Sequence, residues 1–300
     1  MTLSRETLEE WAKMPGSFLL SWTKGVLQDA LREAERLDAC EYEIFLQGSY
    51  ANLTHISGTS DVDLVILMKL PLEEDIEALD AIGRANFHAR YEETSYGWEE
   101  FREDVLATLR KRLYVKEGTK CIDIRHWDSL LRVPADILPA IEYRRYQSFY
   151  LPGMEKYEEG VFFRASNGTA IVNFPKQHLR NGRRKDKATR NLFKPVIRVL
   201  KNARNHLIDE ESLKAVDAPS YFLECLLYNV PNDKFGTSLH GAVQGAVAWL
   251  EQQFDSANFA GFCCQNGVVD LFGPGPDQWD KKTAKDIIKK LSGLCCYRSV

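Results

Sequence analysis

Two aspartates, Asp61 and Asp63, open an apolar run that ends at Met68 and predicts a strand. Residues two apart in a strand point to the same face, so the two carboxylates would lie side by side. A divalent cation relieves their repulsion at the edge of an apolar sheet, and an all-oxygen set of ligands favours Mg²⁺ or Mn²⁺. A D-x-D pair alone is more often two solvated acids at the entry of a strand, so the metal assignment needs support from other residues.

The stretch Gln47-Gly48-Ser49 ends a shorter apolar run, Glu43–Gln47, and precedes the two aspartates. Glycine lets the backbone approach a ligand closely, and the Ser49 hydroxyl and backbone N–H can donate to phosphate oxygens. A lone Gly-Ser is usually only a turn. Here it lies between a predicted strand and a second strand that begins with D-x-D, and this combination predicts a phosphate-binding loop beside a pair of metal ligands.

A site with two metal ions usually needs a third carboxylate. Asp136 is our candidate because its neighbours in Val133–Ala140 are mostly apolar, and a buried carboxylate is costly unless it is paired or binds metal. The alternative is Asp123, which shares one strand face with Arg125 while isoleucines occupy the other. A half-exposed strand with a surface ion pair explains Asp123, so we favour Asp136.

The remaining sequence mixes helical and strand patterns up to about Pro175 and is helical beyond it. Apolar spacing predicts helices at Ser17–Leu37, Leu72–Arg90, Gly97–Arg112, Asn191–His206, Pro219–Tyr228, Leu239–Phe254 and Lys281–Leu291. Besides the two strands above, we expect strands at Leu113–Val115, Cys121–His126, Arg132–Leu138, Val161–Arg164 and Ala170–Val172. This order predicts an α+β fold with two domains, residues 1–174 and residues 175–300.

Positive charge is concentrated between Lys176 and Arg204, where eleven Lys and Arg residues stand against one acid, Asp186, in a chain whose net charge is −4. A local basic stretch on an acidic protein suggests a small polyanionic ligand in a confined site rather than a general nucleic-acid-binding surface. The alternative is a solvated helix face.

The cysteine content favours a reducing compartment, because seven cysteines stand at scattered positions and the count is odd; we therefore expect a cytoplasmic protein. The adjacent pairs Cys263–Cys264 and Cys295–Cys296 lack a histidine at zinc-site spacing. No apolar run reaches the roughly 18–20 residues of a membrane span, and the acidic N-terminus lacks the apolar core of a secretory signal. We expect no membrane association and a monomer.

Several stretches resemble the core of the cGAS/DncV-like nucleotidyltransferases, the CD-NTases, which in bacteria are the signal synthases of CBASS anti-phage defence. The first are Gly48-Ser49, Asp61-Val-Asp63 and Ala135-Asp-Ile-Leu-Pro139, and three later ones are Asn173–His178, Phe193–Lys201 and Pro219–Glu224. The D-x-D core alone fits many polymerase-β-like families, whereas the later stretches point to this one. The resemblance covers about residues 17 to 230.

The resemblance implies a polymerase-β-like nucleotidyltransferase core with a mixed β-sheet, followed by a C-terminal helical domain that closes the nucleotide cleft. It also implies two Mg²⁺ ions, with Mn²⁺ as the substitute, held by Asp61, Asp63 and Asp136.

The same resemblance implies contacts with the triphosphate of the donor nucleotide. These would come from Gln47, Gly48 and Ser49, and from Lys201 and Ser220, which would reach the same phosphates from helices of the second half. The alternatives are a solvated lysine at Lys201 and a helix N-cap at Ser220.

Asn173 resembles a residue that reads uracil in the family's E clade, because an amide can both donate to and accept from the edge of that base. The alternative is an asparagine turn before Pro175. The family reaction joins two ribonucleoside triphosphates into a 3′,3′-linked cyclic dinucleotide and releases pyrophosphate, and a downstream effector binds the product rather than the protein. Two other functions stay open: transfer to RNA ends or to a small hydroxylated acceptor, and nucleotide sensing without catalysis.

Overall fold

The computed structural model describes most of the chain. The described residues are 3–16, 20–31, 37, 40–57, 61–91, 96–124, 134–151, 153–254, 256, 259, 261–275 and 278–295. They form two compact units. The sheet unit comprises Ser17–Tyr50 and Asp61–Pro175, and the helical unit comprises Met1–Gly16, Ala51–Ser60 and Lys176–Val300.

The units change close to the expected position, after Pro175, but two earlier segments belong to the helical unit rather than to the sheet. One is the N-terminal segment, whose helix α1 (Arg5–Ala12) buries Leu8 in the core of the helical unit. The other, Ala51–Ser60, lies between the Gly-Ser stretch and the D-x-D pair in the sequence. A linear division at residue 174 misses both, because neither segment carries a compositional boundary.

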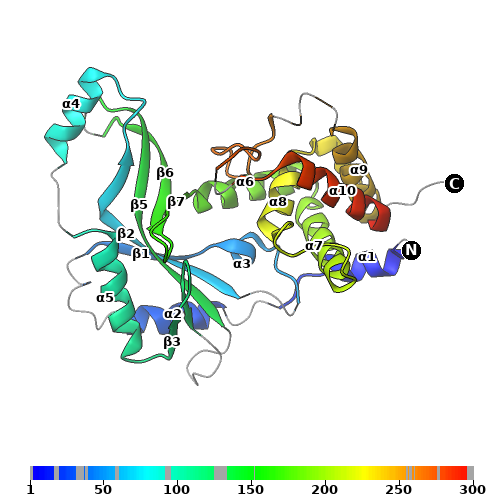
Figure 1. Ribbon diagram of the computed structural model, residues 1–300, viewed down its shortest axis with the longest axis horizontal. Coiled ribbons are helices and arrows are strands. Elements are labelled where there is room, and N and C mark those ends of the chain that lie inside the picture. The colour runs from blue at the N-terminus through cyan, green and yellow to red at the C-terminus, as the bar shows by residue number, and fades with distance from the viewer. Residues whose placement is uncertain are drawn as a thin grey trace. The chain divides into compact units, whose positions relative to one another are not determined.

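The sheet unit contains one mixed sheet, with seven strands among the described residues (Figure 1). They are β1 Tyr42–Leu46, β2 Val62–Asp75, β3 Val115–Glu117, β4 Ile122–Ile124, β5 Ala135–Ser148, β6 Lys156–Arg164 and β7 Ala170–Asn173. The order is β1-β2-β5-β4-β3, with β6 also paired to β5 and β7 paired to β6. Strands β2 and β5 are parallel and the other pairs are antiparallel, which confirms the predicted mixed α+β character.

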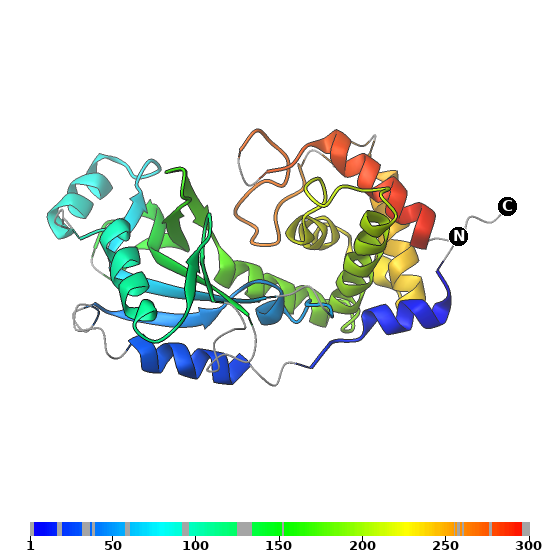
Figure 2. The ribbon, with the colours of Figure 1, turned by 60° about the horizontal axis from the view of Figure 1, so that its bottom comes forward.

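Two helices cover the sheet near the D-x-D strand. Figures 1 and 2 show α2 (Leu20–Leu31) and α5 (Trp98–Arg110) side by side against it. The Trp98 indole N–H donates to the Pro139 carbonyl at 2.9 Å and so fixes α5 to β5. Leu64–Met68 is fully buried, as the sequence of a strand that is apolar on both faces predicts.

One predicted helix, Leu72–Arg90, is wrong in its first part. Residues Leu72–Asp75 continue β2, where Glu73–Asp75 pair with Tyr143–Arg145 of the long strand β5. The helix α4 (Ala81–Arg90) begins only after Asp80, whose carboxylate accepts from the Gly83 N–H. Pairing with β5 therefore outweighs a local sequence with weak strand character. The predicted positions 17–19, 32–36 and 125–133 lie outside the described residues.

The helical unit also contains six further elements: α6 Pro175–Ala188, α7 Phe193–Asp209, α8 Ser220–Tyr228, the short helix η1 Asn232–Phe235, α9 Leu239–Gln252 and α10 Lys281–Cys295. Four of the helices were predicted, with ends shifted by a few residues. Helix α6 was not predicted as a helix, because the side it buries carries Gln177, His178 and Gly182 rather than apolar side chains. Among the helices that the structure describes, none combines the length and apolarity needed to cross a membrane.

Candidate functional site

Three aspartates occupy paired positions on three neighbouring strands of the sheet. Asp63 of β2 is the register partner of Asp136 on β5, and Asp136 is in turn the partner of Asp123 on β4. Asp61 precedes β2 by one residue and is exposed. The predicted pairing of Asp63 with the third carboxylate therefore follows from strand register.

Cys121 lies beside this row of carboxylates. Burial raises the pKa of its thiol to about 12, and the charges of Asp136, Asp123 and Asp63 add to the shift. All three carboxylates therefore share one electrostatic environment. Asp123 is half-buried between two buried isoleucines, as its alternating pattern predicts, while Arg125, its expected partner, lies outside the described residues.

Gly48 packs directly against Asp63. It has a φ of +65°, and a Cβ placed on it would lie 2.0 Å from Asp63 Oδ2. The neighbouring Gln47 N–H donates to the Asp63 carbonyl at 3.0 Å. The Gly-Ser stretch and the D-x-D pair are thus in contact. The predicted turn at Gly48-Ser49 is the start of a five-residue helix, α3 (Gly48–Asn52).

The donor set fits a divalent cation that prefers oxygen ligands. Asp63 and Asp136 present carboxylates from adjacent strands, and the missing side chain of Gly48 leaves room for the Asp63 carboxylate. Within the described part of the chain, no three His, Cys, Asp or Glu side chains are already close enough together to hold a metal ion. The fit rests on the adjacent pair and on Asp61, two residues before Asp63.

Sequence reasoning missed Tyr50, on α3. Burial and then the charge of Asp61 raise the pKa of its phenol. A tyrosine directly after Gly-Ser carries no signal that marks it in advance.

In the helical unit, Lys201 on α7 is buried rather than solvated. Its Nζ lies 2.5 Å from Glu224 Oε1 on α8 and donates to the Thr54 carbonyl at 3.1 Å. Glu224 also accepts from the Thr54 hydroxyl at 2.8 Å and contacts His178 Nε2 on α6 at 3.2 Å. Burial raises the pKa of the Glu224 carboxyl, but the Lys201 and His178 partners outweigh it and lower this pKa to about 2.

Glu224 is a second residue that sequence reasoning missed, although a signal was present. It lies within the apolar run of α8, between Leu223 and Cys225. A carboxylate buried there would strongly destabilise the fold unless it were paired. Ser220, by contrast, is the first residue of α8, since Pro219 occupies the N-cap position. The N-cap alternative for Ser220 is therefore wrong.

Asn173 is the last residue of β7, and it pairs with Val161 of β6. Its backbone carbonyl approaches Gly160 so closely that a Cβ there would lie 2.8 Å away. The residue is thus the end of a strand rather than part of a turn, and its side chain is half-exposed.

The basic stretch divides between two environments. On α6, Arg180, Arg183 and Lys187 are exposed, as a solvated helix face requires. On α7, Arg198 and Lys201 are buried, and Arg198 donates to the carbonyls of Leu53 and Ala12 at 2.6 Å each. The solvated-face interpretation therefore holds for α6, while the two buried cations of α7 have partners within the protein, and the polyanionic ligand stays a prediction.

Comparison with known proteins finds two matching family models. Residues 27–147 match a nucleotidyltransferase domain, and residues 180–295 match the cGAS/DncV-like nucleotidyltransferase C-terminal helical domain. The chain is 32% identical over 306 residues to the cyclic nucleotide synthase CdnE01 of Staphylococcus haemolyticus, covering 97% of this chain and 98% of that protein. It is 33% identical over 298 residues to a cyclic UMP-AMP synthase of Rhodothermus marinus, covering 98% of each.

Solved structures of CdnE enzymes also match this chain. The Rhodothermus marinus CdnE c-UMP-AMP synthase with Apcpp and Upnpp superimposes with a TM-score of 0.83 and 33% identity, covering 97% of this chain and 95% of that one. The Elizabethkingia meningoseptica CdnE cyclic dinucleotide synthase with GTP and Apcpp gives a TM-score of 0.78 at 25% identity, covering 99% and 100%.

Proposed function

Because this chain belongs to the cGAS/DncV-like nucleotidyltransferases, we propose that it joins two ribonucleoside triphosphates into a 3′,3′-linked cyclic dinucleotide and releases pyrophosphate at each step. The chain is a nucleotidyltransferase with the polymerase-β-like core and C-terminal helical domain predicted from its sequence. The observation that carries the proposal is the register of Asp63 with Asp136, with Gly48 packed against Asp63.

Asp61, Asp63 and Asp136 are the proposed ligands of two Mg²⁺ ions, for which Mn²⁺ can substitute. Such ions, when bound, supply positive charge that favours ionisation of the attacking 3′-hydroxyl and departure of pyrophosphate. The residues themselves act by positioning, since phosphoryl-type transfer needs little covalent chemistry from the protein. The 3′-oxygen of one nucleotide attacks the α-phosphorus of the other, and the bond to pyrophosphate breaks.

Gln47, Gly48 and Ser49 are proposed to bind the donor triphosphate, with Lys201 and Ser220 as further phosphate contacts. The close packing of Gly48 on Asp63 supports the first three, because it places a phosphate-binding backbone beside the proposed metal ligands. The burial of Lys201 in an ion pair means that its contact with phosphate would exchange one of its present partners.

Asn173 is proposed to select uracil, so that at least one substrate is UTP. Two relatives of this chain support a pyrimidine: the cyclic UMP-AMP synthase of Rhodothermus marinus and a cyclic dipyrimidine nucleotide synthase of Legionella pneumophila, 31% identical over 292 residues. The half-exposed amide at the end of β7 can pair with the donor and acceptor groups of uracil.

The biological setting that we propose is CBASS anti-phage signalling by a cytoplasmic monomer. A downstream effector would bind the cyclic product, while the protein itself would contact only nucleotides. Membership of the family supports this proposal, because a relative of this chain is a cyclic nucleotide synthase.

The test is to incubate the protein with Mg²⁺ and all four ribonucleoside triphosphates, treat the mixture with phosphatase and identify the products by mass spectrometry. We expect a phosphatase-resistant cyclic dinucleotide that contains uracil. A product attached to RNA or to a small acceptor would instead establish the alternative transferase function.

The metal ligands are tested in the same assay. Asp61→Asn combined with Asp63→Asn should abolish turnover and leave the circular dichroism spectrum unchanged, and Asp136→Asn should do the same. Asp123→Asn, the register neighbour on β4, is the matched control and should keep most of the activity. Full turnover in the double variant, or its loss only in the Asp123 variant, contradicts the assignment.

A further inference from the structure

A buried segment separates the two motifs of the proposed site. After Tyr50 the chain leaves the sheet unit, packs within the helical unit and returns at Asp61. Its described residues include Asn52, Thr54 and His55, which are all at least 95% buried. Polar residues at that depth require partners, so specific polar contacts hold this connection in addition to the packing of the buried Ile56.

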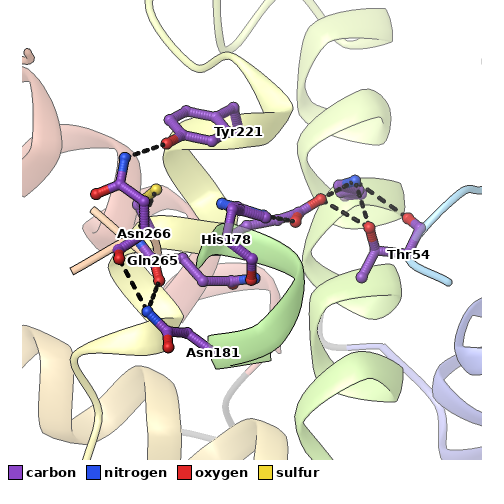
Figure 3. Close-up of polar contacts among 9 residues, drawn as sticks. Thr54, His178, Asn181, Tyr221, Gln265 and Asn266 are labelled. Atoms are coloured by element: carbon purple, nitrogen blue, oxygen red, sulfur yellow. Dashed lines mark hydrogen bonds and ion pairs between the residues drawn. The ribbon is translucent and has the colours of Figure 1, made fainter. Parts of the chain in front are cut away.

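Glu224 lies at the centre of those contacts, between Thr54 and His178, which Figure 3 labels. One of its carboxylate oxygens accepts from the Thr54 hydroxyl and pairs with Lys201, and the other contacts His178. A single buried carboxylate therefore joins the 51–57 segment to three helices: α6, α7 and its own helix α8.

Lys201 contacts both Glu224 and Thr54, which also contact each other. Its ammonium has three N–H bonds, and three oxygens surround it: Glu224 Oε1, the Thr54 carbonyl at 3.1 Å and the Thr54 hydroxyl at 3.4 Å. Removing the Glu224 charge would leave a buried cation without its counter-ion, which is far more disruptive than losing a surface pair.

The segment continues directly into the proposed phosphate-binding residues. Helix α3 spans Gly48–Asn52, so Gly48 and Ser49 share one helical turn with the buried Asn52. Two residues further along, Thr54 is fixed by Glu224 and Lys201. Movement of Thr54 would therefore be passed to the Gly-Ser backbone through a short stretch of chain.

We propose that Glu224 is a positioning residue for triphosphate binding, which it serves by fixing both Lys201 and the 51–57 segment that follows Gly48-Ser49 in the chain. It need not touch the nucleotide. This inference rests on the proposed function, because that function assigns phosphate contacts to Gly48, Ser49 and Lys201. Asp63 and Asp136 are held by the sheet, so the catalytic step itself depends less on Glu224.

The experiment compares wild type with Glu224→Gln, which keeps the shape of the side chain and removes its charge. We expect the KM for nucleoside triphosphates to rise about tenfold, the order expected for losing one charge-assisted hydrogen bond, while kcat changes much less. A merely structural role would lower the amount of active enzyme, and hence the apparent kcat, without raising KM.

Two further variants distinguish a positioning role of Glu224 from a general loss of stability. Thr54→Val removes only the hydroxyl that links the segment to Glu224, and it should reproduce part of the rise in KM. Glu142→Gln is the matched control, because Glu142 is equally buried and pairs with Lys69 at 3.0 Å and Arg144 at 2.6 Å, yet lies outside the proposed site. It should leave KM unchanged.

Binding of a non-hydrolysable UTP analogue, measured by calorimetry with Mg²⁺, separates this inference from the proposed function. If wild type makes no cyclic product, the proposed function fails, and the dissociation constants of the three variants still decide the role of Glu224. Unchanged KM and unchanged affinity in Thr54→Val and in folded Glu224→Gln overturn the inference; if Glu224→Gln does not fold, Thr54→Val alone decides.

Discussion

At Gly48, backbone conformation and close contact both exclude a side chain. A φ of +65° is unfavourable for other residues, and a Cβ would overlap Asp63 Oδ2. We expect Gly48→Ala to displace Asp63 and to reduce turnover at least about 100-fold, since misplacement by about 1 Å has effects of that order. Initial rates of cyclic product formation measure this directly.

Gly168→Ala is the control for backbone strain. Gly168 also has a positive φ, +81°, but no atom lies within 4 Å of the position that its Cβ would take. Gly168→Ala should lose about 1–2 kcal/mol of stability from backbone strain and keep its activity. Gly48→Ala should lose more stability, because its Cβ also overlaps Asp63, and should lose activity as well. Equal activity in the two would mean that the contact with Asp63 has no role in catalysis.

Asn173 allows a test of base selection by one side chain. Asn173→Ser keeps a polar group but removes the amide that can both donate to and accept from uracil. We expect the uracil content of the product to fall when all four triphosphates compete, with total turnover less affected. Mass spectrometry of the products measures both the uracil content and the total turnover. An unchanged base composition would show that Asn173 does not select the base.

At the scale of single residues, sequence patterns were most informative where chemistry and periodicity coincide. Asp61 and Asp63 could be placed at the start of a strand because their spacing matches the period of a strand, and β2 begins between them, at Val62. The pairing of Lys201 with Glu224 could not be predicted, because the two residues lie on different helices and their contact depends on how α7 and α8 pack. Which side chain a buried charge pairs with is therefore determined by the tertiary structure.

At the scale of elements, hydrophobic periodicity located helices with apolar buried sides and failed where the buried side is polar. Helix α7 was predicted because Val196, Leu200 and Leu207 recur on one face. Helix α6 was missed because its buried positions carry Gln177 and His178, whose burial depends on partners elsewhere in the fold. A sequence pattern cannot supply those partners.

Lys185 makes helix α6 sensitive to pH. Its Nζ donates to the Val230 carbonyl and lies 5.6 Å from the centre of the Phe235 ring, and burial lowers its pKa to about 8. Between this value and the unfolded value near 10.5, the unfolded chain binds more protons than the folded one. Stability conferred by this site therefore rises as pH increases through that window.

The measurement is the difference in unfolding free energy between wild type and Lys185→Met, taken by urea denaturation at several pH values. This difference cancels the titration of the other groups. We expect it to shift in favour of wild type from about pH 8 to about pH 10. A difference that does not change with pH would show that Lys185 has an ordinary pKa.

At the scale of the whole molecule, both compact units are assembled from discontinuous segments. The N-terminal segment is tied to the helical unit by polar contacts as well as by Leu8. Asn202 donates to the Trp11 carbonyl at 3.1 Å, and the Leu3 N–H donates to the Leu294 carbonyl at 3.1 Å. The ends of the described chain therefore meet within one unit, and sequence order alone did not indicate this.

This arrangement predicts that a substitution near the N-terminus destabilises the distant C-terminal helices. Leu8→Ala removes a side chain that is 1% exposed in the core shared with α7 and α9, and should lower the stability of the helical unit by about 2–5 kcal/mol. Hydrogen exchange followed by mass spectrometry should show faster exchange in α7, α9 and α10, with the sheet strands β2 and β5 unchanged.

Leu70→Ala on β2, where the side chain is 53% exposed, is the control and should alter neither region. If Leu8→Ala accelerates exchange only within α1, the N-terminal segment unfolds independently and does not stabilise the core of the helical unit.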